Sequence, residues 1–243
     1  MRMITFAKRN FNEIIRDPLN LAFLFGFPVV LLLLLSAIQA NIPVSLFEIA
    51  RLSPGVAVFG LSFLTLFSAT LISKDRQSSF MQRLYTTPMK PFDFILGYTL
   101  PMIPIAIIEG VACYFLAVIL GLGISANILI SLVFLVPVAV LYIGIGLLCG
   151  SVFNDKQVGG ICGALLTNLS AWLSGIWFDL ELVGGVFKKI AYALPFVHSV
   201  EMERAVILGN IGDALSHMWW VLGYAVIIIV AAVFLFLRQM KRQ

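Results

Sequence analysis

The sequence is poor in charged residues. Of its 243 residues, 12% are Asp, Glu, Lys or Arg, whereas about 25% is usual in a soluble domain. The hydrophobic share is 61%, so the chain lacks the polar surface that an ordinary soluble enzyme needs. The same figures exclude an intrinsically disordered chain, which combines low hydrophobicity with high net charge. The composition therefore indicates a membrane protein.

Residues that commonly serve catalysis or metal binding are also scarce. The chain has two histidines, His198 and His217, and three cysteines, Cys113, Cys149 and Cys162. Two imidazoles are too few for a zinc site, so we interpret the histidines as interfacial residues. The cysteines show no CxxC spacing and are interpreted as apolar packing residues. HExxH, GxSxG and GxxxxGK[ST] motifs are absent, so we expect no catalytic residue, no metal site and no cofactor bound by this chain.

Long uncharged runs are what the sequence does contain. A helix that crosses about 30 Å of hydrocarbon needs about 20 apolar residues. The runs predict an all-α polytopic membrane protein with six transmembrane helices in a single domain, residues 1–243. The predicted spans are residues 19–38, 52–73, 94–120, 128–148, 157–178 and 217–237.

The positions of the few charged residues predict how the chain is oriented in the membrane. Of the 16 Lys and Arg residues, 12 lie in the segments on the side of the two termini and 4 in those on the other side. Because cytoplasmic loops carry the excess of basic residues, both termini are predicted to be cytoplasmic. We expect a bacterial or archaeal cell membrane. The basic residues do not gather on one surface, so the net charge of +4 does not indicate a nucleic-acid partner.

Two segments on the predicted cytoplasmic side have helical periodicity. Residues 2–17 predict an interfacial helix, and the alternative is a basic leader that only sets topology. Residues 74–88 predict a short amphipathic helix, although periodicity alone fits a solvated loop equally well. The apolar face of the first helix is predicted to consist of Ile4, Ala7, Phe11, Ile14 and Ile15.

The last connection on the outer side, residues 181–209, is too apolar for a free loop. We expect two short re-entrant helices, broken at Pro195, that dip into the outer interface. An extra pair of spans is the alternative, but its charges make that costly. The side chains expected to reach water are Lys188, Lys189, Glu201, Glu203 and Arg204.

Three features inside the spans are distinctive. Glu109 is the only charged residue between Asp93 and Asp155, so it should be protonated, paired or next to a wet cavity. A substrate contact, a proton-linked switch and a packing hydrogen bond all remain open for it. Pro101 and Pro104 predict a kinked third span. Two GxxxG pairs predict close packing of the fourth span against the fifth: Gly146 with Gly150, and Gly159 with Gly163.

Together these elements resemble the membrane subunit of ABC type-2 exporters over nearly the whole chain. The resemblance is carried by an amphipathic N-terminal helix, six spans with both ends inside, and two segments, DRQSSFMQRLYTTPMKPFDFILGY and ALPFVHSVEMERAVILG. In the first segment, Asp75 and Ser78 or Ser79 replace the usual glutamate and glycine of the family. The threonine-proline ending is present at Thr87 and Pro88.

The resemblance implies partners that this chain does not contain. In the family, the segment that corresponds to residues 74–88 is a coupling helix, and it docks on a separate ATPase subunit that binds ATP and Mg. Two membrane subunits pair around a central path, and we expect an identical copy rather than a paralogue. The resemblance thus assigns ATPase docking to Asp75, Arg76, Gln77, Ser79, Phe80, Arg83, Leu84, Thr87 and Pro88.

The function expected from these observations is export, without enzymatic activity in this chain. A hydrophobic small molecule or an antimicrobial peptide is the favoured substrate, because the expected path residues are largely apolar. The alternatives are a polysaccharide or lipid-linked substrate, or an ion-coupled secondary transporter that uses Glu109. The candidate path residues are Glu109, Asn168, Trp172, Ser174 and Trp177.

Overall fold

The computed structural model describes residues 2–42, 47–78 and 91–240, and within these ranges all regular structure is helical. Among the described residues, five helical stretches are long and apolar enough to cross a membrane: Pro18–Gln39, Ile49–Gln77, Phe92–Ile119, Ala126–Val152 and Ile211–Arg238. The elements are α1 (Arg2–Ile15), α2 (Pro18–Leu21), η1 (Ala22–Gly26), α3 (Phe27–Gln39), α4 (Ile49–Gln77), α6 (Pro91–Thr99), α7 (Met102–Ile119), α8 (Ala126–Val152), α9 (Asp155–Val158), η3 (Gly159–Leu166), α10 (Thr167–Leu173), α11 (Leu180–Val183), α12 (Gly185–Tyr192), α13 (Pro195–Ile207) and α14 (Ile211–Met240).

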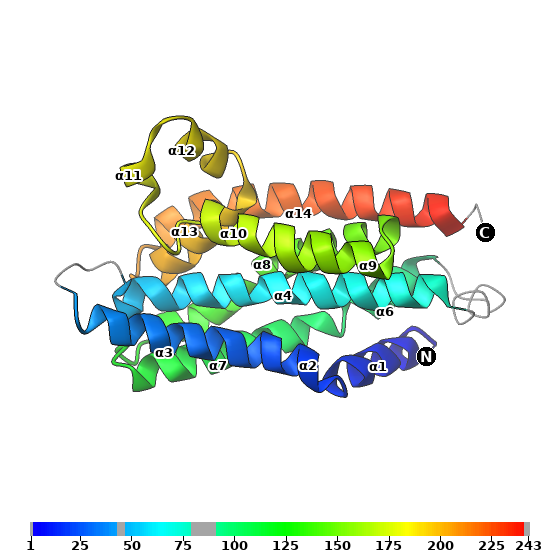
Figure 1. Ribbon diagram of the computed structural model, residues 1–243, viewed down its shortest axis with the longest axis horizontal. Helices are drawn as coiled ribbons and strands as arrows, with labels where there is room; N and C mark the ends of the chain where they lie inside the picture. Colours follow the sequence, from blue (N-terminus) through cyan, green and yellow to red (C-terminus); the bar gives the residue numbers. More distant parts are fainter. Residues whose placement is uncertain (1, 43–46, 79–90, 241–243) are drawn as a thin grey trace.

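The helices lie roughly side by side along the long axis of the molecule (Figure 1). Both termini lie at one end, together with the end of α4 and the start of α6 (Figure 1). The opposite end carries α11 and α12 (Figure 1). This arrangement agrees with an even number of crossings between the two termini.

Helix α4 lies at the centre of the bundle. Its most apolar stretch is 89% buried, compared with 22% to 50% for the other four candidate spans. One of its polar side chains bonds to a neighbouring helix: Thr65 Oγ1 donates a hydrogen bond of 2.7 Å to the carbonyl oxygen of Tyr142 in α8. Because α4 has almost no lipid-facing surface, its neighbours fix its position.

Close approach between α4 and α8 depends on glycine. A Cβ added at Gly150 would lie 2.8 Å from both the carbonyl oxygen of Ala69 and the Cβ of Ile72. Gly146 faces Ser68 of α4 in the same way, and Gly163 packs on Leu66 of α4. The prediction that these glycines join the fourth span to the fifth is therefore wrong: Gly146, Gly150 and Gly163 face α4, and a Cβ at Gly159 would meet nothing within 4 Å.

The predicted fifth span, residues 157–178, is shorter than expected as a helix. Residues 155–173 form the consecutive segments α9, η3 and α10, which run beside α4 (Figure 1). Helix ends after Leu173 because Gly175 adopts a positive φ of 71°, a conformation that breaks the helix. This segment is not one of the five candidate spans, so a sixth crossing stays a prediction.

Other element boundaries also differ from expectation. Helix α4 continues past the predicted end at residue 73 to Gln77, because no residue before Ser78 breaks it. The third stretch is interrupted at Pro101, which precedes α7, and this agrees with the predicted kink. The segment 181–209 contains three short helices instead of two, because Gly184 and Gly185 add a break with positive φ to the one before Pro195.

The α4–α8 contact gives a first prediction. Gly150→Ala should lower the thermal unfolding temperature in detergent, because the added methyl group meets backbone atoms that cannot move aside. The expected cost is about 1–3 kcal/mol. Gly223→Ala is the matched control, since a Cβ at Gly223 in α14 meets nothing within 4 Å. Equal stability of the two variants would contradict the close approach of α4 and α8.

Candidate functional site

The N-terminal helix α1 packs against α6 at the end that holds the termini (Figure 1). Phe6 is buried, and its ring lies 6.0 Å from the ring of Phe94 and 4.9 Å from that of Tyr98. Gly97 leaves room for this ring, because a Cβ there would overlap with Phe6. Asn10 Nδ2 donates a hydrogen bond of 2.9 Å to the carbonyl oxygen of Gly97. Aromatic packing and one buried amide thus fix α1 on α6.

The buried face of α1 agrees only in part with the predicted one: Ala7 and Ile14 are buried and Phe11 packs against the core. Ile4 is 62% exposed and Ile15 is 44% exposed, whereas Phe6 and Asn10 are buried. The predicted apolar residues Ile4 and Ile15 instead form a stripe beside the buried face, where a helix at a membrane surface would meet lipid. The sequence did not distinguish a protein-facing stripe from a lipid-facing one, because both are apolar.

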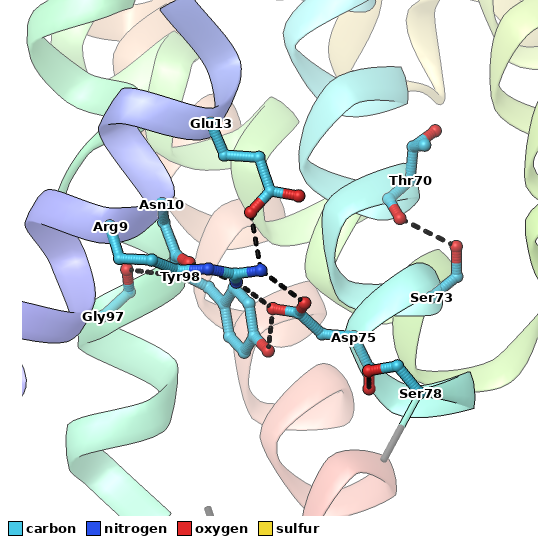
Figure 2. Close-up of polar contacts among 9 residues, drawn as sticks. All are labelled: Arg9, Asn10, Glu13, Thr70, Ser73, Asp75, Ser78, Gly97 and Tyr98. Atoms are coloured by element: carbon cyan, nitrogen blue, oxygen red, sulfur yellow. Dashed lines mark hydrogen bonds and ion pairs between the residues drawn. The ribbon is translucent and has the colours of Figure 1, made fainter. Parts of the chain in front are cut away.

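A charged network joins α1 to the end of α4. Arg9 contacts Asp75 through two bonds, Nη1 to Oδ2 at 2.5 Å and Nη2 to Oδ1 at 2.9 Å. Tyr98 of α6 donates its hydroxyl to Asp75 Oδ2 at 2.9 Å, and Glu13 accepts from Arg9 at 2.6 Å. Figure 2 shows Asp75 reaching from α4 to the guanidinium and the phenol. One carboxylate therefore ties three helices together.

The electrostatics of this network favour the charged pair. Asp75 is 4% exposed, so its charge needs internal partners, and a bidentate arginine supplies the strongest kind. Burial lowers the pKa of the Arg9 guanidinium, but the hydrogen bond and charge of Asp75 raise it, and the pKa lies above its ordinary value. Arg9 therefore remains protonated at any physiological pH.

The next residue, Arg76, connects α4 to α8. Its Nη2 donates to the carbonyl oxygen of Phe153 at 2.7 Å, and its Nη1 donates to that of Ser151. These carbonyl groups lie at the end of α8, where no following helical turn supplies N–H groups to bond them. Asn154 then begins α9 with a capping box that includes Gln157. Asp75 and Arg76 together attach the end of α4 to α1, α6 and α8 immediately before residues 79–90.

The predicted docking residues divide into two groups. Asp75 is buried and bound to Arg9, Arg76 is partly exposed, and Gln77 is exposed. The remaining predicted docking residues lie outside the described ranges: Ser79, Phe80, Arg83, Leu84, Thr87 and Pro88.

The predicted path residues do not form one cluster. The Glu109 carboxyl lies between α7 and Gly60 of α4, and Oε1 accepts a hydrogen bond of 3.1 Å from Cys113. Trp177 packs on Phe59 of α4 with ring centres 5.8 Å apart. Ser174 is buried, whereas Asn168 and Trp172 are exposed on the α9–α10 segment.

Two further findings concern the other end of the bundle. Glu203 was expected to reach water, but it is fully buried, because its side of α13 faces α7 and α8. Its Oε2 accepts hydrogen bonds from Ser131 and Tyr114. His198 and His217 lie close together, with 2.9 Å between their Nδ1 atoms. No group of three or more His, Cys, Asp or Glu residues that could hold a metal ion occurs within the described ranges.

The chain matches a known protein family. The family model described as "ABC-2 type transporter" matches residues 1–208. The matched range contains every residue of the network described above, from Arg9 in α1 to Tyr98 in α6. A search of curated proteins finds no match to the chain.

The network gives a second prediction. Asp75→Asn should lower the free energy of unfolding by about 1–3 kcal/mol, because it removes the buried, bidentate ionic partner of Arg9. Thermal unfolding in detergent measures the effect. Glu13→Gln is the control, since this pair has both side chains partly exposed and such pairs contribute under about 1 kcal/mol. In a double-mutant cycle with Arg9→Gln, fully additive effects would contradict the coupling of Arg9 to Asp75.

Proposed function

The chain belongs to the ABC-2 type transporter family and is a transmembrane subunit of such a transporter, and from this premise we propose a specific role. The chain is an exporter permease that moves a hydrophobic small molecule or an antimicrobial peptide outward. A separate ATPase subunit, which binds ATP and Mg, supplies the energy. In this proposal, the end with both termini is cytoplasmic and the opposite end is the outer end.

The observation that supports this role most strongly is the attachment of α4. Its last residues, Asp75 and Arg76, bind α1, α6 and α8. Residues 79–90, which contain most of the proposed docking surface, follow directly. A partner that pushes on this segment would therefore act on the end of a central, enclosed helix. Asp75 serves as an anchor in this arrangement, while the ATPase contacts residues further along the segment.

The exposed face of the α9–α10 segment supports pairing with a second permease. Gly160, Ala164 and Asn168 follow one another at intervals of four residues and are all exposed. Small residues at this spacing let membrane helices approach closely, and an amide side chain can bind across the contact. Trp172 continues the same row. We propose that an identical copy faces this row and that the two copies enclose the path.

The apolar character of this face favours an apolar substrate. Besides Trp172, the exposed side chains include Leu165 and Leu169. A polysaccharide would need a path lined with hydrogen-bonding groups. A lipid-linked substrate is the closer alternative, because its lipid part would suit such a face.

A third prediction tests docking on an ATPase. Leu84→Glu should abolish co-purification with the ATPase encoded beside this chain, because a charge replaces an apolar docking residue. Asn12→Glu adds the same charge on the exposed side of α1 and should leave binding intact. ATP hydrolysis by the purified complex is the second measurement. If Leu84→Glu binds and stimulates the ATPase like the wild type, residues 74–88 are not the docking surface.

A fourth prediction separates the exporter from an ion-coupled transporter. Glu109→Gln should retain normal expression and ATP hydrolysis in the reconstituted complex, because the carboxyl fills a space against Gly60. Gly60→Ala should lower thermal stability, and adding Glu109→Ala should restore part of it by making room for the new methyl group. If Glu109→Gln is stable but inactive, and a proton gradient drives transport by the wild type, the ion-coupled alternative gains support.

A further inference from the structure

Arg204 joins three parts of the molecule at the outer end. From α13, its Nε donates to the carbonyl oxygen of Arg51 at 3.1 Å, and its Nη2 donates to that of Gly175 at 3.0 Å. Its Nη1 binds Glu201 Oε1 at 2.9 Å. Arg51 lies in the first turn of α4, and Gly175 follows α10. We call this group, Arg204 with Glu201 and the two carbonyl oxygens, the Arg204 clamp.

The clamp needs an arginine. All three guanidinium nitrogens are used, and the side chain is 11% exposed. The planar fork directs its donors at separate acceptors, whereas the single ammonium of lysine could not serve all three. Once the carbonyl groups move away, the nearly buried charge has to be hydrated. The three hydrogen bonds of the Arg204 guanidinium therefore form together, and water takes the place of their acceptors when they break.

Two cavities meet at the clamp. One has a volume of about 60 Å³ and is lined in part by residues of the chain between Gly175 and Leu180. The other has a volume of about 250 Å³ and reaches Asp213 and His217 at the start of α14. Arg51, Glu201 and Arg204 line both cavities. The clamp is thus their common wall, and releasing it would join two polar spaces at the outer end.

Next to the clamp, the Ile176 side chain packs against Gly55 and joins the chain after α10 to α4. A Cβ added at Gly55 of α4 would lie 3.1 Å from Ile176 Cγ1, and Ile176 is 3% exposed. Figure 1 shows the start of α4, the end of α10 and α13 at this same end of the bundle. The labelling rate of a thiol at position 176 would therefore report whether the contact is open.

The neighbouring residue holds another side of α13, about 100° around the helix axis. Glu203 is fully buried and accepts hydrogen bonds from Ser131 of α8 and Tyr114 of α7. The two sides of α13 thus differ, because Glu203 is enclosed by protein while Arg204 borders the two cavities. Water can replace the partners of Arg204 much more easily than those of Glu203, so the Arg204 side opens first.

Helix α4 connects the clamp to the cytoplasmic network. It runs without interruption from Arg51 to Arg76, about 38 Å at 1.5 Å per residue. A tilt of about 5° around its middle would move each end by about 1.7 Å. This shift would stretch a hydrogen bond of 3.1 Å well beyond the usual limit.

We propose that the Arg204 clamp is the closing contact of the outer end during transport. When α4 tilts, the carbonyl oxygen of Arg51 leaves Arg204, and the two cavities merge. Glu203 meanwhile keeps α13 attached to α7 and α8. Arg204 is therefore a positioning residue for release at the outer end, and this role rests on the proposed function.

Labelling of Ile176→Cys with a membrane-impermeant maleimide tests the clamp without an ATPase or a substrate. Adding Arg204→Gln should raise the labelling rate about tenfold or more, since a charge-assisted contact of this size shifts an opening equilibrium by at least that factor. The control is Lys188→Gln, which removes a cation from the exposed pair with Glu181 at the same end. The parent chain, with buried Cys113, Cys149 and Cys162, gives the background.

Unchanged labelling in Arg204→Gln, or an equal increase in Lys188→Gln, would overturn the clamp. If Arg204→Gln does not accumulate, Arg204→Lys replaces it, because it keeps the charge and loses the fork. It should then label faster by the same reasoning.

A second arm uses the complex with the ATPase. ATP with vanadate should raise labelling at position 176 relative to the nucleotide-free complex, and an unchanged rate would overturn the role in transport. If no ATPase binds, the proposed function fails and the role in transport fails with it. The result without the ATPase would still show whether the clamp closes the outer end, so the two failures are distinguishable.

Discussion

Helix α4 has almost no lipid to face, and much of the structure follows from that constraint. Lipid tails are as apolar as leucine, so helices in a membrane gain little from hiding apolar side chains from one another. Enclosing a helix on all sides therefore requires close contact between backbones and internal hydrogen bonds. Gly146 and Gly150 of α8 supply the close contact, and Thr65 supplies a hydrogen bond to α8.

Enclosure also explains the position of the arginines at the ends of the bundle. Where α8 ends, carbonyl groups lose their helical partners, and few waters are at hand to replace them. Arg76 donates to two such groups, and Arg204 donates to Gly175 after α10. In both places an acidic residue precedes the arginine and points into the protein, Asp75 toward α1 and α6 and Glu203 toward α7 and α8. Neighbouring residues, about 100° apart around the helix axis, thus bind different sides of one helix.

The sequence contains good information on the helices and poor information on their partners. Uncharged runs correctly indicate a helical membrane protein, because the cost of a charge in hydrocarbon dominates that pattern. The pairing of Arg9 with Asp75 could not be predicted, since these residues lie 66 positions apart and either could face water. The burial of Glu203 was missed for a related reason. An acidic residue among charged neighbours is typical of an exposed face, and only the contacts with Ser131 and Tyr114 reveal otherwise.

The contacts along α4 differ in how they respond to movement. In the middle, Gly60 lies against Glu109 and Ser68 lies against Gly146, and such van der Waals contacts tolerate a small rotation about the point of contact. At the ends, hydrogen bonds hold Asp75 and the carbonyl oxygen of Arg51, and these weaken steeply with distance and angle. In the proposed mechanism, α4 tilts about its enclosed middle and does not slide. Even a small tilt then changes the contacts at both ends at once, which is the property that a transporter needs to link the two sides of a membrane.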